Sequence, residues 1–146
     1  MTIKRLDHVS VVVEDLDGAV AFFTALGMTI EGRQPVEGAW VDRINELQGV
    51  RLDIVMMRTP DGHGKLELTK FHHPPLVATE PAIAPVNVLG LRTVMFAVDS
   101  IDDTIARLRA HGGELMGEVV QYENLYRLCY TRGPAGMIVA LAEELF

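Results

Sequence analysis

The chain has 146 residues, of which 49% are hydrophobic and 23% are charged, a composition that excludes a disordered protein. Its net charge of −7 and its scattered Lys and Arg residues exclude the basic surface that binds nucleic acids, so we expect no nucleic-acid partner. No apolar run approaches the roughly 18 residues that cross a bilayer, and the first residues lack a signal-peptide core. We therefore expect a cytoplasmic protein without a membrane partner.

The first elements in chain order are a predicted strand and a predicted helix. Residues 6–17, LDHVSVVVEDLD, contain alternating valines that suit packing under a helix. This alternation places His8 and Ser10 on the opposite face of the strand. The following run, DLDGAVAFFTALG, has apolar residues at helical spacing and predicts a helix that ends at Gly27.

Three further strands and one short helix are predicted before the middle of the chain. Alternating apolar residues predict the strands over 28–33, 51–59 and 65–71, and the last two are joined by the turn PDGHG. Between the first two strands, Trp40 and Ile44 at helical spacing predict an extra short helix near 39–48.

The next segment, residues 72–89, contains four of the chain's seven prolines. Proline at this density continues neither a helix nor a central strand, so the segment predicts an extended tether between two modules.

The second half repeats the order of the first. Residues 91–102, LRTVMFAVDSID, match residues 6–17 and place Thr93 where the first copy has His8. The runs that follow predict a helix that begins at Ser100 and three strands, over 114–122, 125–132 and 137–143. Cys129 lies inside the second of these strands, where a small buried side chain is the favoured interpretation over a nucleophile.

A strand, a helix and three strands therefore occur twice, which is the signature of an internal repeat. We predict an α+β fold of two βαβββ modules. The first module covers residues 1–71, the tether 72–89 and the second module 90–146.

This pattern resembles the vicinal-oxygen-chelate superfamily, which includes glyoxalase I, extradiol dioxygenases and bleomycin-resistance proteins. The resemblance is carried by the LDHVSVVVEDLD opening and by the PDG…LEL and GPAG…VAL endings of the two halves. It implies a glyoxalase-like fold, in which each module curls a mixed sheet into a cup and the cups enclose a shared pocket.

The resemblance also implies where a divalent metal would be held, because the enzymes use His on the first strand and Glu or Gln on the last strand of each half. The matching residues here are His8 and Glu67, followed by Thr93 and Ala140. Alanine offers no ligand atom and a neutral hydroxyl is a poor one, so we hypothesise that the metal centre has been lost. A third ligand from His72, His73 or a neighbouring subunit is the alternative that would keep a weakly bound Zn, Ni, Mn or Fe.

We accordingly expect a protein that binds a small, largely apolar molecule in its cup, as bleomycin-binding relatives do. The alternative is a divalent-metal-dependent lyase, epimerase or dioxygenase of the same superfamily. If the protein is catalytic, we expect Glu67 to orient His8 as a general base. We also expect a homodimer. The residues predicted to line the ligand pocket are His8, Ser10, Glu67, Thr93, Met95 and Ala140.

Overall fold

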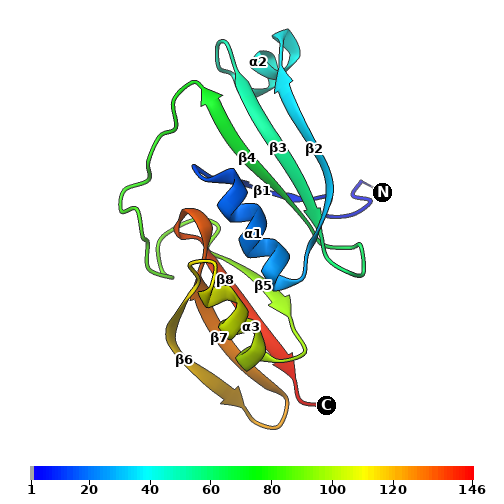
Figure 1. Cartoon of the computed structure of the whole chain (residues 1–146), viewed down its shortest axis with the longest axis vertical. Coiled ribbons are helices and arrows are strands. Elements are labelled where there is room, and N and C mark those ends of the chain that lie inside the picture. The colour runs from blue at the N-terminus through cyan, green and yellow to red at the C-terminus, as the bar shows by residue number, and fades with distance from the viewer. Residues whose placement is uncertain (1) are drawn as a thin grey trace. The chain divides into compact units, whose positions relative to one another are not determined.

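The computed structural model describes residues 2–146, which form two compact units, one ending at Val77 and the other spanning Ala78–Phe146. The first unit contains β1 (Val9–Val12), α1 (Leu16–Leu26), β2 (Thr29–Glu37), α2 (Ala39–Asn45), β3 (Arg51–Arg58) and β4 (Lys65–His73) (Figure 1). The second unit contains β5 (Thr93–Ala97), α3 (Ile101–Arg109), β6 (Glu114–Tyr122), β7 (Tyr126–Arg132), a 3₁₀ turn (Pro134–Gly136) and β8 (Ile138–Glu144).

Each unit has one four-stranded sheet, and the two sheets have the same topology. The strand orders are β1-β4-β3-β2 and β5-β8-β7-β6. The first strand of each unit runs parallel to the last, and the remaining neighbours are antiparallel, so both sheets are mixed. The predicted α+β fold with two βαβββ modules is thereby confirmed. None of the helices in the described part of the chain is long and apolar enough to cross a membrane.

In the first unit, α1 packs on one face of the sheet. Asp15 caps the helix by accepting a hydrogen bond from the Gly18 amide, and the helix ends at Gly27, whose φ of 122° a side chain would disfavour. Phe23 on α1 and Leu68 on β4 are both fully buried. Burial of such side chains contributes about 1.5–3 kcal/mol each.

The short helix α2 covers part of the opposite face of the same sheet. Val41 of α2 is buried in a small cluster with Val36, Val50 and Leu52, against which Ile54 and Phe71 also pack. Phe71 shares its strand face with Glu67, since the two lie four residues apart on β4. This apolar cluster therefore covers one end of the face of the sheet that α1 leaves uncovered, which we call the open face.

In the second unit, α3 packs on one face of its own sheet. Ser100 caps α3 by accepting a hydrogen bond from the Asp103 amide, and Ile101, Leu108 and Leu141 are almost fully buried. Glu143 of β8 accepts a second hydrogen bond at this helix end, from the Ile101 amide. The Ser100 hydroxyl and the Glu143 carboxylate thus accept hydrogen bonds from amides that have no partner within the helix.

Residues 74–92 form neither helix nor strand, and β4 continues through His73, two residues beyond the predicted strand. Part of this segment is fixed to the second unit. Arg132 donates hydrogen bonds to the carbonyl oxygens of Ala84 and Gly136. A Cβ at Gly136 would lie 2.8 Å from the Ala82 carbonyl oxygen, so this close approach requires glycine.

Cys129 of β7 is 4% exposed, and burial raises the pKa of its thiol. Because the thiolate is the reactive form, we expect Ellman's reagent at about pH 8 to label native Cys129 more than about tenfold more slowly than unfolded protein. Cys129→Ala is the control and should show no labelling. Equal rates with and without denaturant would show that the thiol is accessible.

Candidate functional site

The first unit places two predicted site residues, Ser10 and Glu67, on neighbouring strands of its open face. The edge strand β1 pairs in parallel with β4, and the register sets Ser10 opposite Glu67. Val13, Leu66 and Leu68 point to the helix-covered face and are buried. Alternation therefore turns Ser10 and Glu67 to the face that α1 does not cover.

The Glu67 carboxylate is the centre of a polar cluster, which we define as Asp7, His8, Ser10, Glu67 and Thr69. The hydroxyls of Ser10 and Thr69 both donate to Glu67 Oε1, at 2.9 Å and 3.1 Å. His8 Nε2 lies 3.5 Å from the other oxygen, Oε2. The side chain of Glu67 is 20% exposed and that of His8 31% exposed, so both remain accessible to a ligand.

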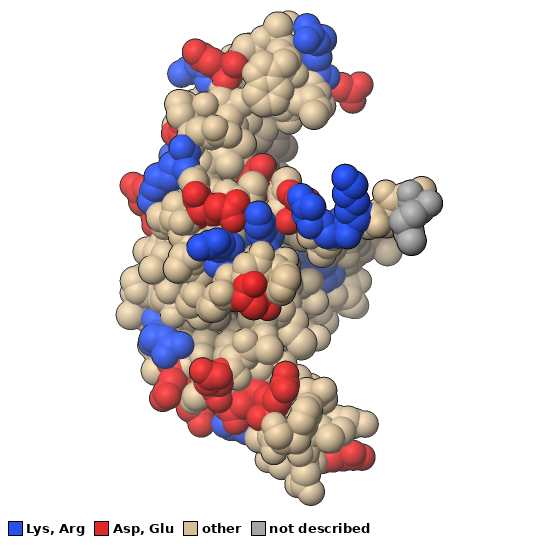
Figure 2. Space-filling model, turned by 90° about the vertical axis from the view of Figure 1, so that its right-hand side faces the viewer, with Lys and Arg blue, Asp and Glu red and all other residues tan. Residues whose placement is uncertain are grey.

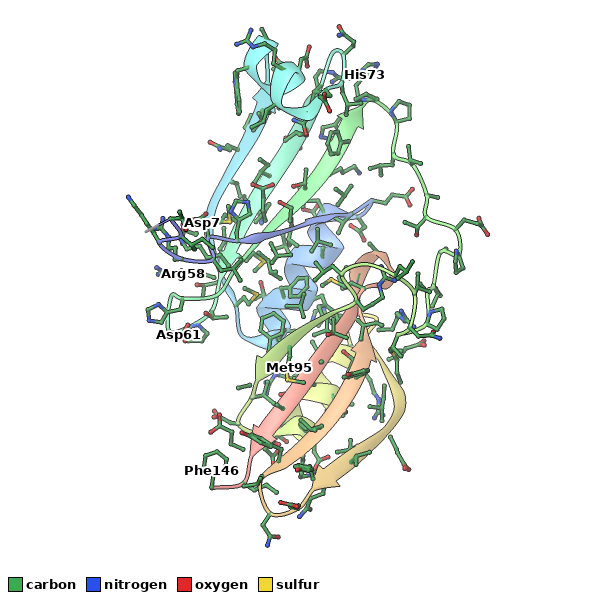
Figure 3. The ribbon with its side chains drawn as sticks, turned by 180° about the vertical axis from the view of Figure 1, so that it is seen from behind. Asp7, Arg58, Asp61, His73, Met95 and Phe146 are labelled. Carbon is green, nitrogen blue, oxygen red and sulfur yellow. The ribbon has the colours of Figure 1, made fainter. Side chains whose placement is uncertain are left out.

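Asp7 holds the other side of the His8 ring. His8 Nδ1 lies 2.9 Å from Asp7 Oδ2, while Arg5 Nη2 donates to Asp7 Oδ1 at 3.0 Å. These two hydrogen bonds, that of His8 first, hold the pKa of the Asp7 carboxyl below its usual range. Figure 3 labels Asp7 on the segment that leads into β1.

The contact between Asp7 and His8 differs from the prediction that Glu67 would orient His8. Asp7 Oδ2 lies 2.9 Å from His8 Nδ1, whereas Glu67 Oε2 lies 3.5 Å from His8 Nε2. Sequence reasoning missed Asp7 because neighbouring residues of a strand point to opposite faces. The strand begins only at Val9, so Asp7 and His8 lie on irregular backbone where that alternation does not hold.

Apolar side chains lie beside the polar cluster on the open face. Met56 of β3 is in register with Glu67 and is half-buried, and Val12 of β1 is 49% exposed. Gly32 of β2 is in register with Met56, and nothing lies within 4 Å of where its Cβ would be. The open face thus offers room and apolar surface around one polar position.

The open face of the second unit is largely apolar at the corresponding place. Thr93 and Met95 lie on β5, where Met95 is 52% exposed and labelled in Figure 3. Met95 and Tyr130 are the register neighbours of Ala140 on either side. Ala140 was predicted to line the ligand pocket but has no exposed surface. The accessible surface at this place is formed by Met95 and by Tyr130, which is 38% exposed. Tyr130 was not identified from the sequence, although its place between Cys129 and Thr131 on one strand puts it on the opposite face from those two residues.

The donor set does not fit a tightly held catalytic metal. Among residues 2–146, no three His, Cys, Asp or Glu side chains converge where one ion would be bound. His8 and Glu67 supply two donors, whereas a catalytic zinc site uses three protein ligands. In the second unit, the matching positions Thr93 and Ala140 carry only one neutral hydroxyl between them.

The two histidines at the end of β4 have other partners. His72 Nε2 lies 2.8 Å from Asp53 Oδ2, and His73 Nδ1 donates to the Gly49 carbonyl oxygen at 2.9 Å. The alternative in which one of them completes a metal site with His8 and Glu67 gains no support from these contacts.

On the face shown in Figure 2, blue Lys and Arg side chains lie beside red Asp and Glu side chains. Such mixing gives that face no continuous basic track for a phosphate backbone. The Arg127 guanidinium donates two hydrogen bonds to Asp102, each at 3.2 Å.

Comparison with known proteins identifies the family. Residues 5–141 match the model of the Glyoxalase/Bleomycin resistance protein/Dioxygenase superfamily, and the chain belongs to this superfamily. It is similar to a glyoxalase family protein from Bacillus cereus, with 51% identity, a TM-score of 0.95 and coverage of 100% of this chain and 97% of that chain.

More distant solved structures share the fold. An antibiotic binding protein from a Streptomyces species is 20% identical with a TM-score of 0.62, over 99% of this chain and 98% of that one. A glyoxalase/dioxygenase from Nostoc punctiforme is 18% identical with a TM-score of 0.66, over 98% and 92% of the two chains. No curated protein matches the chain significantly.

The hydrogen bond from Thr69 to Glu67 is open to a direct energetic test. Thr69 is 5% exposed, and Thr69→Val removes its hydroxyl while keeping its shape. In a double-mutant cycle with Glu67→Met, measured by urea unfolding, we expect a coupling free energy of about 0.5–1.5 kcal/mol. Thr131→Val is the matched control, because the buried Thr131 hydroxyl donates to the Val139 carbonyl oxygen. Its coupling to Glu67→Met should be near zero, and equal coupling in both cycles would refute the contact.

Proposed function

We propose that the protein binds a small, largely apolar molecule through one polar group of that molecule, without a complete metal centre. The observation that carries this proposal is the polar cluster around Glu67, beside which the apolar side chains of Met56 and Val12 lie on the open face. Ligand pockets commonly combine apolar lining with a few placed polar groups that fix orientation.

The surroundings of the cluster suit such a ligand. Met56 and Val12 supply apolar surface beside Glu67, and Met is an adaptable lining residue. Each 100 Å² of apolar surface removed from water contributes roughly 2.5 kcal/mol before the costs of binding. The polar cluster then selects among apolar molecules by their hydrogen-bonding group.

The comparisons support a binding role for this fold through one solved structure. One structural neighbour is described as an antibiotic binding protein, and at 20% identity it shares the fold alone with this chain. Sequestration of a natural product is therefore the concrete form of the proposal. The fold alone does not determine the function, so the proposal depends mainly on the polar cluster.

A second candidate function is proton abstraction from a bound substrate without a metal. The observation in its favour is the 2.9 Å contact between Asp7 and His8 Nδ1, because a carboxylate in this position orients an imidazole as a general base. The two candidates differ in the fate of the ligand, which is recovered unchanged under the first and altered under the second.

The proposal predicts that a thermal-shift screen of apolar natural products with one or two polar groups will find a compound that stabilises the protein. Stabilisation should grow with ligand concentration and reach about 2.7 kcal/mol at a hundred times Kd. Mass spectrometry of the recovered ligand should show it intact. We expect Glu67→Met to weaken binding by about tenfold or more, whereas the exposed Glu37→Met on β2 should leave it unchanged.

Two outcomes would count against binding as the function. A screen without any concentration-dependent stabilisation would reject a ligand-binding role for the open face. A recovered ligand that has lost or moved a proton at one carbon, with the change abolished in His8→Phe, would favour the catalytic candidate.

A further inference from the structure

We infer that the open face of the second unit binds an uncharged aromatic molecule that carries a hydrogen-bond acceptor, such as a carbonyl oxygen. This face is the side of the second sheet that α3 leaves uncovered. The inference goes beyond the proposed function, which concerns the polar cluster of the first unit. It rests on the side chains that the sheet register brings together on this face.

All three tyrosines of the chain lie on this one face. Tyr126 of β7 is in register with Tyr122 of β6, and Tyr130 lies four residues further along β7. Even spacing along a strand keeps side chains on one face, so the three rings share their face with Met95, which Figure 3 labels. Phe146 adds a fourth ring, which packs edge-on against Tyr126 with the ring centroids 5.8 Å apart.

The tyrosine hydroxyls on this face are available to a ligand. Within residues 2–146, none of the three takes part in a hydrogen bond with another residue. Each hydroxyl can donate one hydrogen, and tyrosine combines this polar tip with an apolar ring, as recognition surfaces commonly require. A ligand with an acceptor oxygen would use donors that the protein itself leaves unused.

The middle of the face carries no charged side chain. It consists of two rows of residues in register across the sheet: Met95, Ala140, Tyr130 and Met116 in one, and Ala97, Ala142, Leu128 and Val120 in the other. The charged residues lie in the rows at either end, Glu144 in one and Arg132 with Glu114 in the other. A charged group bound in the middle would lose water without gaining a partner, so the face selects a neutral molecule.

Two alanines set the size of the group that fits. Ala97 and Ala142 are register neighbours and lie one row away from Met95 and Tyr130. Neighbouring strands are about 4.8 Å apart and alternate residues of a strand about 6.8 Å apart, so the two alanines leave a low area about as large as one ring. A ring placed there contacts the Met95 thioether and the Tyr130 ring, and both attract aromatic groups beyond their burial of apolar area.

The exposed area of the face suits a small molecule better than a second protein. Fully exposed side chains of this size present about 200 Å² each, so the exposed parts of Met95, Val120, Tyr122, Tyr130 and Phe146 amount to roughly 550 Å². Each partner of a stable protein interface contributes about 800 Å², whereas patches of about 300–600 Å² occur on monomers and are often functional.

Three probes with one carbon skeleton test the inference: benzophenone, dicyclohexyl ketone and diphenylmethane. Dicyclohexyl ketone keeps the carbonyl and loses the aromatic rings, whereas diphenylmethane keeps the rings and loses the acceptor. Binding is measured by titration of the full chain, followed by backbone amide NMR. We expect benzophenone to shift the signals of Ala97, Tyr130 and Ala142. It should bind about threefold or more tightly than either analogue, although both analogues are at least as apolar.

Three variants locate the two preferences, with circular dichroism confirming the fold of each. Replacing all three tyrosines by phenylalanine removes the hydroxyls and keeps the rings. The preference over diphenylmethane should then disappear, while the preference over dicyclohexyl ketone remains. Tyr130→Leu removes one ring and should weaken benzophenone binding about threefold or more. Trp40→Leu removes an exposed ring from α2 in the first unit and should leave all three affinities unchanged.

Each other outcome overturns the inference. Dicyclohexyl ketone binding as tightly as benzophenone would show that the face accepts any apolar molecule. A dimer in light scattering that Tyr130→Leu dissociates, without benzophenone binding, would assign the face to a second copy of the chain. If a natural product from the screen shifts the signals of Ser10 and Glu67 while benzophenone shifts none, the inference fails and the proposed function stands.

Discussion

The strict alternation of side chains along β1 and β4 is the constraint on which the rest of the structure depends. Leu66 and Leu68 are buried under α1, and this burial fixes Glu67 on the opposite face. A slip of one residue would expose both leucines and bury an ionised carboxylate, at a cost of several kcal/mol. The apolar core of the first unit therefore positions the Glu67 carboxylate on the open face. In the second unit burial does not separate the two faces in this way, since residues 138–142 of β8 are all buried.

The open faces of the two sheets differ in chemistry although their topology is the same. On the first, the Ser10 and Thr69 hydroxyls hold one oxygen of Glu67, and Asp7 holds His8, so the cluster is arranged before any ligand arrives. Preorganisation of this kind lowers the entropic cost of binding. On the second, Met95 and Tyr130 present apolar and aromatic surface. Where the first half has His8 and Glu67, the second half has Thr93 and Ala140, which carry only one neutral hydroxyl between them.

Most of the fold could be predicted from the sequence, because the repeat and the two apolar periodicities are strong signals. The extra helix near Trp40 was also predicted, and it spans Ala39–Asn45. The predicted bounds of β2 and β4 were too short. For β2 the reason is Pro35, which lies on an edge strand where its missing amide costs no sheet hydrogen bond. The details of the site were less accessible. The role of Asp7 depends on irregular backbone before β1, and the burial of Ala140 depends on larger neighbours from two other strands.

The central claim is that the Glu67 cluster serves a ligand's polar group in place of a complete metal centre. Metal content after equilibrium dialysis against Zn²⁺, Ni²⁺, Mn²⁺ or Fe²⁺ tests this claim most directly. Two protein donors hold a divalent ion weakly, so the account predicts occupancy far below one ion per chain at micromolar metal. One tightly bound ion per chain, lost on His8→Ala or Glu67→Ala, would contradict the account and establish a metalloprotein.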